Sequence, residues 1–149
     1  MGITKKRALL VCTNNSCRSQ MAEGIVNYDL GNQLEAFSAG IMPTFVHPRA
    51  IEAMKEIGID ISGQRSKSMA EFTGQPFDYV ITLCDNADEQ CPLFFGDVKK
   101  MHMGFADPAA ATGTEEEMMK AFRKVRDEIG SRLLEFFSVE LAKKGHHGN

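Results

Sequence analysis

Two cysteines, an arginine and a serine lie close together near the start of the 149-residue chain, in the stretch CTNNSCRS. Cys12 opens this stretch, and Arg18 and Ser19 close it. A loop of this kind between a strand and a helix turns successive backbone N–H groups inward, where they bind a tetrahedral oxyanion. Arg18 adds a planar fork of donors that fits two oxygens of the anion. These dipoles favour the thiolate of Cys12, so the loop predicts an oxyanion site with Cys12 as its nucleophile.

The remaining loop residues complete this predicted site. Asn14 and Asn15 tolerate the left-handed backbone that such a loop requires, and the Ser19 hydroxyl can hydrogen-bond the Cys12 sulfur. We expect the oxyanion to be bound by the whole loop: Thr13, Asn14, Asn15, Ser16, Cys17, Arg18 and Ser19. The alternatives are a buried cysteine that simply ends a strand, and a zinc site, which the wide cysteine spacing disfavours. We expect Cys17 to point away along the helix and to pack in the core.

The loop lies within an alternating pattern of strands and helices. Apolar runs predict strands at residues 7–12, 34–38, 77–84 and 99–104, and helical spacing predicts helices at 16–30, 48–58 and from 114 onward. This alternation predicts an α/β fold of three layers, in which an open four-stranded parallel sheet is flanked by helices. Ligands of such sheets bind at the carboxyl ends of the strands. Cys12 and Cys84 each end a predicted strand there.

Length and composition are those of one domain spanning residues 1–149, with a flexible tail expected at 143–149. The net charge of -3, with both signs mixed along the chain, argues against a nucleic-acid surface. The apolar run ending at Cys12 is too short for a signal peptide or a membrane span, so we expect a cytoplasmic monomer. Thiols stay reduced in the cytoplasm, so four cysteines indicate reactive thiols rather than structural disulfides.

The loop CTNNSCRS, placed near the start of the chain between a strand and a helix, resembles the phosphatase loop of the low-molecular-weight protein tyrosine phosphatases. In that superfamily the first Cys is the nucleophile, the Arg binds the oxyanion and a distant Asp-Pro supplies the general acid. Asp107-Pro108 matches the last of these. The resemblance covers nearly the whole chain, and it implies the same fold, with the phosphatase loop after strand 1.

Three features resemble the thioredoxin-coupled arsenate reductases of this superfamily. Tyrosine phosphatases flank the acid with aromatic residues that grip a phenyl ring, whereas Asp107 is followed by PAAATG. In addition, Cys84 and Cys91 frame the segment CDNADEQC directly after the third predicted strand. The run DPAAATGTEEEMMKAFRKVRDEI also resembles the C-terminal segment of that family. We therefore expect arsenate as the substrate.

The resemblance implies a relay of three cysteines. Cys12 attacks arsenate while Asp107 protonates the leaving hydroxide, a transient Cys12–Cys84 disulfide releases arsenite, and a Cys84–Cys91 disulfide follows. Thioredoxin reduces that disulfide, with glutathione and glutaredoxin as the alternative reductant, and no cofactor or metal is implied. The alternative enzymatic function is that of a phosphatase for small or aryl phosphates, which would need only Cys12, Arg18 and Asp107. A module that senses an oxyanion or metal without turnover is the non-enzymatic alternative.

The spacing of the last two cysteines predicts a conformational change. If residues 84–91 were helical, the Cα atoms of Cys84 and Cys91 would lie roughly 10 Å apart, beyond the limit of about 7 Å for a disulfide. The segment 84–97 must therefore change its conformation when the two cysteines are oxidised.

A second cluster suggests a site for a positive charge. Asn15, Glu23 and Ser38 match positions that in some of these reductases help to bind a monovalent cation. The family takes a further carboxylate from the segment that here reads QRSKS, where Lys67 or Arg65 stands instead. Our hypothesis is that one of these basic side chains replaces the cation and pairs with Glu23. The alternative is a solvated cluster of charges.

Overall fold

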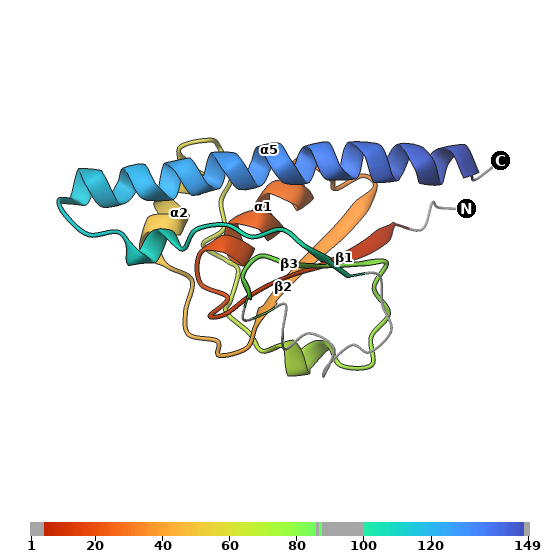
Figure 1. Ribbon diagram of the computed structural model, residues 1–149, viewed down its shortest axis with the longest axis horizontal. Helices are drawn as coiled ribbons and strands as arrows, with labels where there is room; N and C mark the ends of the chain where they lie inside the picture. Colours follow the sequence, from red (N-terminus) through yellow and green to blue (C-terminus); the bar gives the residue numbers. More distant parts are fainter. Residues whose placement is uncertain (1–4, 86, 88–99, 148–149) are drawn as a thin grey trace.

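The computed structural model describes residues 5–85, 87 and 100–147. A four-stranded sheet in the order β2-β1-β3-β4 forms its middle layer, and every pairing within the sheet is parallel (Figure 1). The strands are β1 (Lys6–Cys12), β2 (Leu34–Gly40), β3 (Tyr79–Thr82) and β4 (Lys100–His102). The predicted open parallel sheet of four strands is confirmed.

The helices follow the strands as the sequence predicts. They are α1 (Arg18–Leu30), α2 (Pro48–Lys55) and α5 (Glu115–His147), with short 3-10 helices η1 (Met69–Phe72) and η2 (Pro108–Ala110). A capping box begins α5, because Thr114 Oγ1 accepts from the Glu117 N–H at 3.1 Å and Glu117 Oε1 accepts from the Thr114 N–H at 2.9 Å. No helix within the described part of the chain is both long and apolar enough to cross a membrane.

The end of α5 differs from the expectation for the tail. The sequence predicts a flexible tail from residue 143, whereas α5 continues to His147. Lys143 Nζ lies 3.5 Å from Glu140 Oε2, and an ion pair at this spacing supports a helix on its own surface. The helix therefore extends into the segment assigned to the tail.

The two faces of the sheet pack against different layers. Along β1, Leu10 and its alternate neighbours join a core with α1 and α5, while Leu9 and Val11 join a second core with Met69 and Phe72 of η1. Figure 1 shows α1 and α5 side by side over one face and η1 below the other. Side chains alternate between the faces of a strand, so a strand segment buried on both faces is apolar, as β1 is from Ala8 to Cys12.

The carboxyl edge of the sheet holds the loops that bear the candidate chemistry. β1 lies between β2 and β3, so the chain continues from β1 to a strand on one side and later adds a strand on the other side. The carboxyl end of β1 is therefore a topological switch point, where ligands bind in such sheets. Cys12 ends β1 as predicted, but Cys84 does not end a strand. β3 ends at Thr82, opposite His102 at the end of β4, although the Leu83 carbonyl still accepts from the Phe105 N–H beyond that point.

Two glycines test how closely α1 is packed. A methyl group at Gly24 of α1 would meet Ile61 Cγ2 at 2.6 Å, whereas one at Gly130 of α5 would meet Ile25 Cδ1 at an ordinary 3.6 Å. Gly24→Ala should lower the free energy of unfolding by about 1–3 kcal/mol, because overpacking outweighs the helix propensity gained. The matched change Gly130→Ala should raise it by about 0.5–1 kcal/mol. Urea unfolding of both variants checks this, and equal effects would contradict it.

Candidate active site

The loop between β1 and α1 is turned so that its N–H groups face inward. The carbonyls of Thr13, Asn14 and Ser16 accept hydrogen bonds of 2.9, 3.3 and 3.1 Å from backbone N–H groups of the segment 42–47. Within a trans peptide unit the C=O and the following N–H point in opposite directions. The N–H group that follows each of these carbonyls is therefore directed into the loop, as an oxyanion cradle requires.

Asn15 gives the loop its turn. Its φ is 49°, in the left-handed region that asparagine tolerates better than most residues. Gly40, at the end of β2, lies against this turn, because a Cβ there would approach both Asn15 N and Thr13 O to 2.8 Å. The absence of a side chain at Gly40 lets β2 end directly beside the loop.

The hydroxyl of Ser19 is a hydrogen-bond partner of the Cys12 sulfur. Cys12 is buried, and its Sγ lies 2.9 Å from Ser19 Oγ. Asn15 Oδ1 accepts from the Lys67 N–H and from Gln20 Nε2, both at 2.9 Å, so the amide nitrogen must face Ser19. Asn15 Nδ2 donates to Ser19 Oγ at 2.7 Å, and the Ser19 hydroxyl can donate its hydrogen to a Cys12 thiolate. This hydrogen bond stabilises the thiolate of Cys12.

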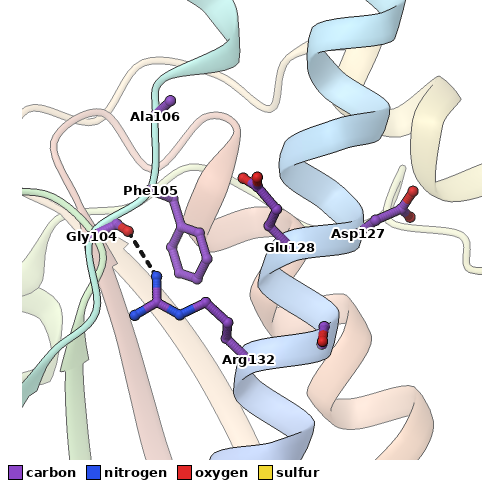
Figure 2. A pocket seen from close by; sticks show the side chains of 7 residues that line it. Gly104, Phe105, Ala106, Asp127, Glu128 and Arg132 are labelled. Atoms are coloured by element: carbon purple, nitrogen blue, oxygen red, sulfur yellow. Dashed lines mark hydrogen bonds between the residues drawn. The ribbon is translucent and has the colours of Figure 1, made fainter.

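Arg18 closes the cradle from the first turn of α1. Its Nη1 donates to the Phe105 carbonyl at 3.2 Å, on the segment that runs beside α5 (Figure 2). Its Nη2 lies 3.9 Å from Asp107 Oδ2. Nε is buried and has no hydrogen-bond partner among the described residues. An unpaired buried donor is costly, and an oxyanion in the cradle would satisfy it.

The predicted residues surround one cavity of about 240 Å³. Cys12, Arg18 and Asp107 all line it, and so do Asn14, Ser16, Cys17 and Ala109. Asp107 caps η2 through a 3.0 Å bond from the Ala109 N–H to Oδ1, and its other carboxylate oxygen is the one near Arg18. The structure thus brings a thiol, a guanidinium and a carboxyl group to the same small space.

Two further residues line the cavity that sequence reasoning missed. Thr44 and Phe45 come from the segment after β2, and the Phe45 side chain is exposed. The sequence shows no aromatic residue directly after Asp107, but Phe45 reaches the site from a different loop. No local pattern marks it, because its position depends on how β2 and β1 pair.

Cys84 lies at the side of the loop, two residues beyond β3. The Leu83 N–H donates to the Val11 carbonyl at 2.8 Å, which holds the chain against β1 as far as this point. The Cys84 sulfur is then 3.1 Å from Thr13 Oγ1, on the residue next to Cys12. Cys12, Cys17 and Cys84 are all free thiols.

The last cysteine lies outside the described residues. The roles of Cys91 and of the Cys84–Cys91 pair stay predictions, and so does the conformational change expected across residues 84–97.

Cys17 differs from Cys12 in its surroundings. Burial raises the pKa of the Cys17 thiol to about 12, and a hydrogen bond to Ser16 offsets this only in part. Cys17 is therefore a neutral thiol at physiological pH. This agrees with a packing role, although its surface also forms part of the cavity wall.

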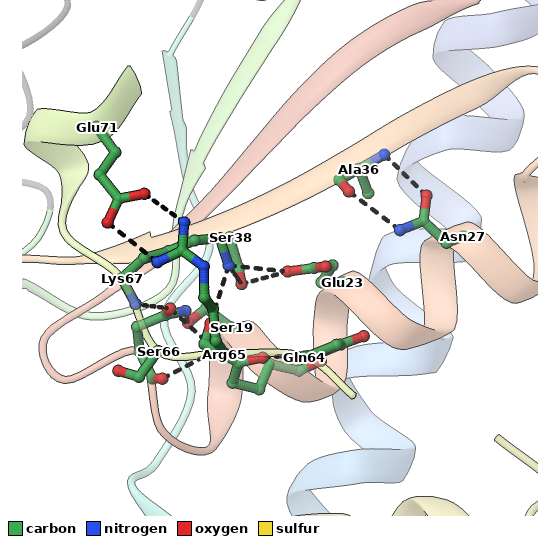
Figure 3. A network of polar contacts seen from close by, with 12 residues as sticks. Ser19, Glu23, Asn27, Ala36, Ser38, Gln64, Arg65, Ser66, Lys67 and Glu71 are labelled. Atoms are coloured by element: carbon green, nitrogen blue, oxygen red, sulfur yellow. Dashed lines mark hydrogen bonds and ion pairs between the residues drawn. The ribbon is translucent and has the colours of Figure 1, made fainter. Parts of the chain in front are cut away.

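A buried ion pair lies behind the loop (Figure 3). Lys67 Nζ is 3.6 Å from Glu23 Oε1, and the two side chains are 11% and 15% exposed. Ser38 Oγ donates to the same carboxylate oxygen, and Lys67 Nζ donates to the Arg65 carbonyl at 3.1 Å. Burial lowers the pKa of Lys67, and the Glu23 carboxylate acts against that effect. The predicted pairing of a basic residue with Glu23 is confirmed, and the residue is Lys67.

Arg65 is not the partner of Glu23. Its guanidinium forms a two-pronged ion pair with Glu71, at 2.6 and 3.1 Å, on the surface (Figure 3). The backbone hydrogen bonds of Lys67 explain why this residue, and not Arg65, pairs with Glu23. The Lys67 N–H donates to Asn15 Oδ1, and the Lys67 carbonyl accepts from the Gly40 N–H, which directs the Lys67 side chain inward.

Comparison with known proteins agrees with this geometry. The family model described as low molecular weight phosphotyrosine protein phosphatase matches residues 7–147. An arsenate reductase of Halalkalibacterium halodurans is 48% identical over 134 residues, which cover 90% of this chain and 96% of that protein. The arsenate reductase of Bacillus subtilis is 51% identical over 126 residues, which cover 85% and 91%.

Solved structures give the same answer for the fold. A structure described as an arsenate reductase in the phosphate binding state has a TM-score of 0.77 and 33% identity, and covers 89% of this chain and 97% of its own. A low molecular weight protein tyrosine phosphatase from T. tengcongensis has a TM-score of 0.76 and 27% identity, covering 90% and 99%. The chain therefore belongs to the low molecular weight phosphotyrosine protein phosphatase family, in which arsenate reductases share about half of its residues.

Proposed function

We propose that the protein reduces arsenate to arsenite by passing the oxidation from Cys12 to Cys84 and then to Cys91. The observation that carries this proposal is the position of Cys84, whose sulfur lies 3.1 Å from the Thr13 hydroxyl, beside Cys12. A phosphatase of this fold needs the cradle and the acid but no second thiol. The relatives named arsenate reductases support the same choice.

Arsenate binding uses the cradle. The inward N–H groups of the loop and the free Nε of Arg18 together offer donors on several sides of a tetrahedral dianion. Arg18 also neutralises part of its charge. The cavity of about 240 Å³ is large enough to accommodate such an ion.

The first covalent step joins sulfur to arsenic. The Cys12 thiolate, stabilised by the Ser19 hydroxyl, attacks As(V) and forms an S–As bond. An As–O bond breaks, and the departing hydroxide takes a proton from Asp107 and leaves as water. Asp107 is suited to this role because it lines the cavity and is held at its edge by the N-terminus of η2.

The second step is the reduction. The Cys84 thiolate attacks Cys12 Sγ, a disulfide forms, and the S–As bond breaks with its electron pair passing to arsenic. As(V) becomes As(III) and leaves as arsenite. Cys91 then attacks Cys84, which frees the Cys12 thiol and leaves a Cys84–Cys91 disulfide for an external reductant.

We infer that thioredoxin supplies the electrons and that the protein acts as a cytoplasmic monomer. A dithiol partner reduces a disulfide in two exchange steps, and the cytoplasm keeps the three cysteines reduced between turnovers. Glutathione with glutaredoxin is the competing reductant. NADPH consumption that depends on arsenate, followed with thioredoxin and thioredoxin reductase beside the glutathione system, decides between them.

Replacing the second thiol tests the relay. Cys84→Ser should abolish turnover of arsenate in the thioredoxin-coupled assay, because no group remains to attack the Cys12 adduct. Phosphate should still protect Cys12 of this variant from alkylation by iodoacetamide, since the cradle is intact, and any hydrolysis of aryl phosphates should survive. The control Cys17→Ser should retain most of the reductase activity. Sustained arsenate reduction by Cys84→Ser would exclude the relay.

We also propose that the Lys67 ammonium takes the place of a bound monovalent cation beside Glu23. The turnover efficiency for arsenate should then stay within about twofold when sodium is exchanged for potassium at constant ionic strength, because the charge at this point is covalently attached. A several-fold rise in potassium would refute the proposal.

A designed variant sharpens this test. Lys67→Asp replaces the ammonium with a carboxylate next to Glu23, so the variant should gain stability from potassium, by about 1.4 kcal/mol at ten times the dissociation constant. Lys67→Met removes the charge without adding a ligand and should show no such gain. Thermal unfolding in potassium chloride and in choline chloride measures both. A potassium effect shared by the two variants and the wild type would contradict a specific site.

A further inference from the structure

Arg132, on the long helix α5, reaches across a groove to the segment that follows β4. Its Nη1 donates to the Gly104 carbonyl at 3.1 Å, and its guanidinium carbon lies 4.8 Å from the centre of the Phe105 ring. Figure 2 shows the side chain extended over this ring. A guanidinium at this distance from an aromatic face makes a favourable cation–π contact.

The backbone of Phe105 also forms hydrogen bonds with two parts of the active site, the chain before Cys84 and the Arg18 guanidinium. The Phe105 N–H donates to the Leu83 carbonyl at 3.1 Å, on the residue before Cys84. The Phe105 carbonyl accepts from Arg18 Nη1 at 3.2 Å. Two residues farther along the chain is Asp107, 3.9 Å from Arg18 Nη2. Phe105 thus connects Arg132 with the residues that bind the oxyanion.

Arg132 has acidic neighbours on its own helix but does not pair with them. Asp127 and Glu128 line the same groove, which has a volume of about 470 Å³. Among the described residues, Arg132 forms no ion pair with either of them, and Asp127 points to the other side of α5 (Figure 2). The guanidinium makes its contacts with Gly104 and Phe105 instead, so Arg132 connects α5 with this segment.

We propose that Arg132 is a positioning residue that sets the affinity of the cradle for its oxyanion through Phe105 and Arg18. The Phe105 carbonyl takes one donor of Arg18 and so determines how the rest of the guanidinium is turned. In the observed orientation Nε has no hydrogen-bond partner in the described part of the chain and is left for the ligand. A shift of the carbonyl rotates the guanidinium, and its hydrogen bonds depend steeply on such angles. This inference rests on the oxyanion site of the proposed function.

Oxyanion affinity is the readout that tests this role. Arg132→Met keeps a long side chain on α5 but loses the hydrogen bond and the cation–π contact. We expect it to raise the dissociation constant for inorganic phosphate, measured by protection of Cys12 from iodoacetamide, by about fivefold. The KM for arsenate should rise by about the same factor with kcat within about twofold, because Arg18 binds the anion throughout the reaction.

Two companion variants separate positioning from general stability. Arg132→Lys keeps a cation near the Phe105 ring and should restore most of the phosphate affinity. Lys120→Met removes an exposed charge from α5 and should behave as wild type, which controls for the change in helix charge. The melting temperature of all variants should stay within about 2 °C of the wild type, since Arg132 is itself exposed.

The outcomes are distinct. Unchanged phosphate affinity in Arg132→Met, or a loss that Arg132→Lys does not restore, would overturn the positioning role. A loss that appears only together with a lower melting temperature would do so as well. Wild-type protein that binds phosphate but does not reduce arsenate would refute the proposed function, while the phosphate comparison would still decide the role of Arg132.

Discussion

The environment of the Cys12 thiol depends on the orientation of one side-chain amide, that of Asn15. Two N–H donors from outside the loop, Lys67 N and Gln20 Nε2, occupy the amide oxygen, so the nitrogen faces Ser19 and the Ser19 hydroxyl hydrogen is available to a Cys12 thiolate. The same residue supplies the left-handed turn of the loop. Loop shape and thiolate stabilisation are therefore coupled, and a side chain that lacks either amide atom would disturb both.

The cradle is held from two sides by segments that are distant in sequence. In a parallel sheet the carboxyl ends of all strands meet at one edge, so the chain after β2 and the chain after β4 both pass the loop that follows β1. The first supplies the N–H groups that turn the loop carbonyls outward, and the second supplies the Phe105 carbonyl that orients Arg18. Donors fixed before the ligand arrives need no reorganisation during the reaction, which is the main advantage of such a site.

Sequence patterns predict this site well where its parts are adjacent in the chain. β1, the loop and α1 follow one another directly, so an apolar run, a polar loop and helical spacing were sufficient. The choice between Lys67 and Arg65 was not accessible, because it depends on which backbone groups bond to Asn15 across the sheet edge. The contribution of Phe45 was missed for the same reason. The predicted end of β3, at Cys84, lies two residues beyond the observed one at Thr82, because an apolar run does not reveal where pairing with the neighbouring strand stops.

The position of Cys84 has a consequence for the order of events in the proposed reaction. Cys12 lines the oxyanion cavity, whereas Cys84 reaches the loop from the side of Thr13 and is not part of the cavity wall. A second thiolate inside the cavity would repel the dianion and oppose its binding. Because Cys84 lies outside the cavity, it contacts Thr13, the residue next to Cys12, without competing with the anion for the donors of the cradle. The anion can therefore bind and react with Cys12 first, and Cys84 then approaches the adduct from outside the cavity.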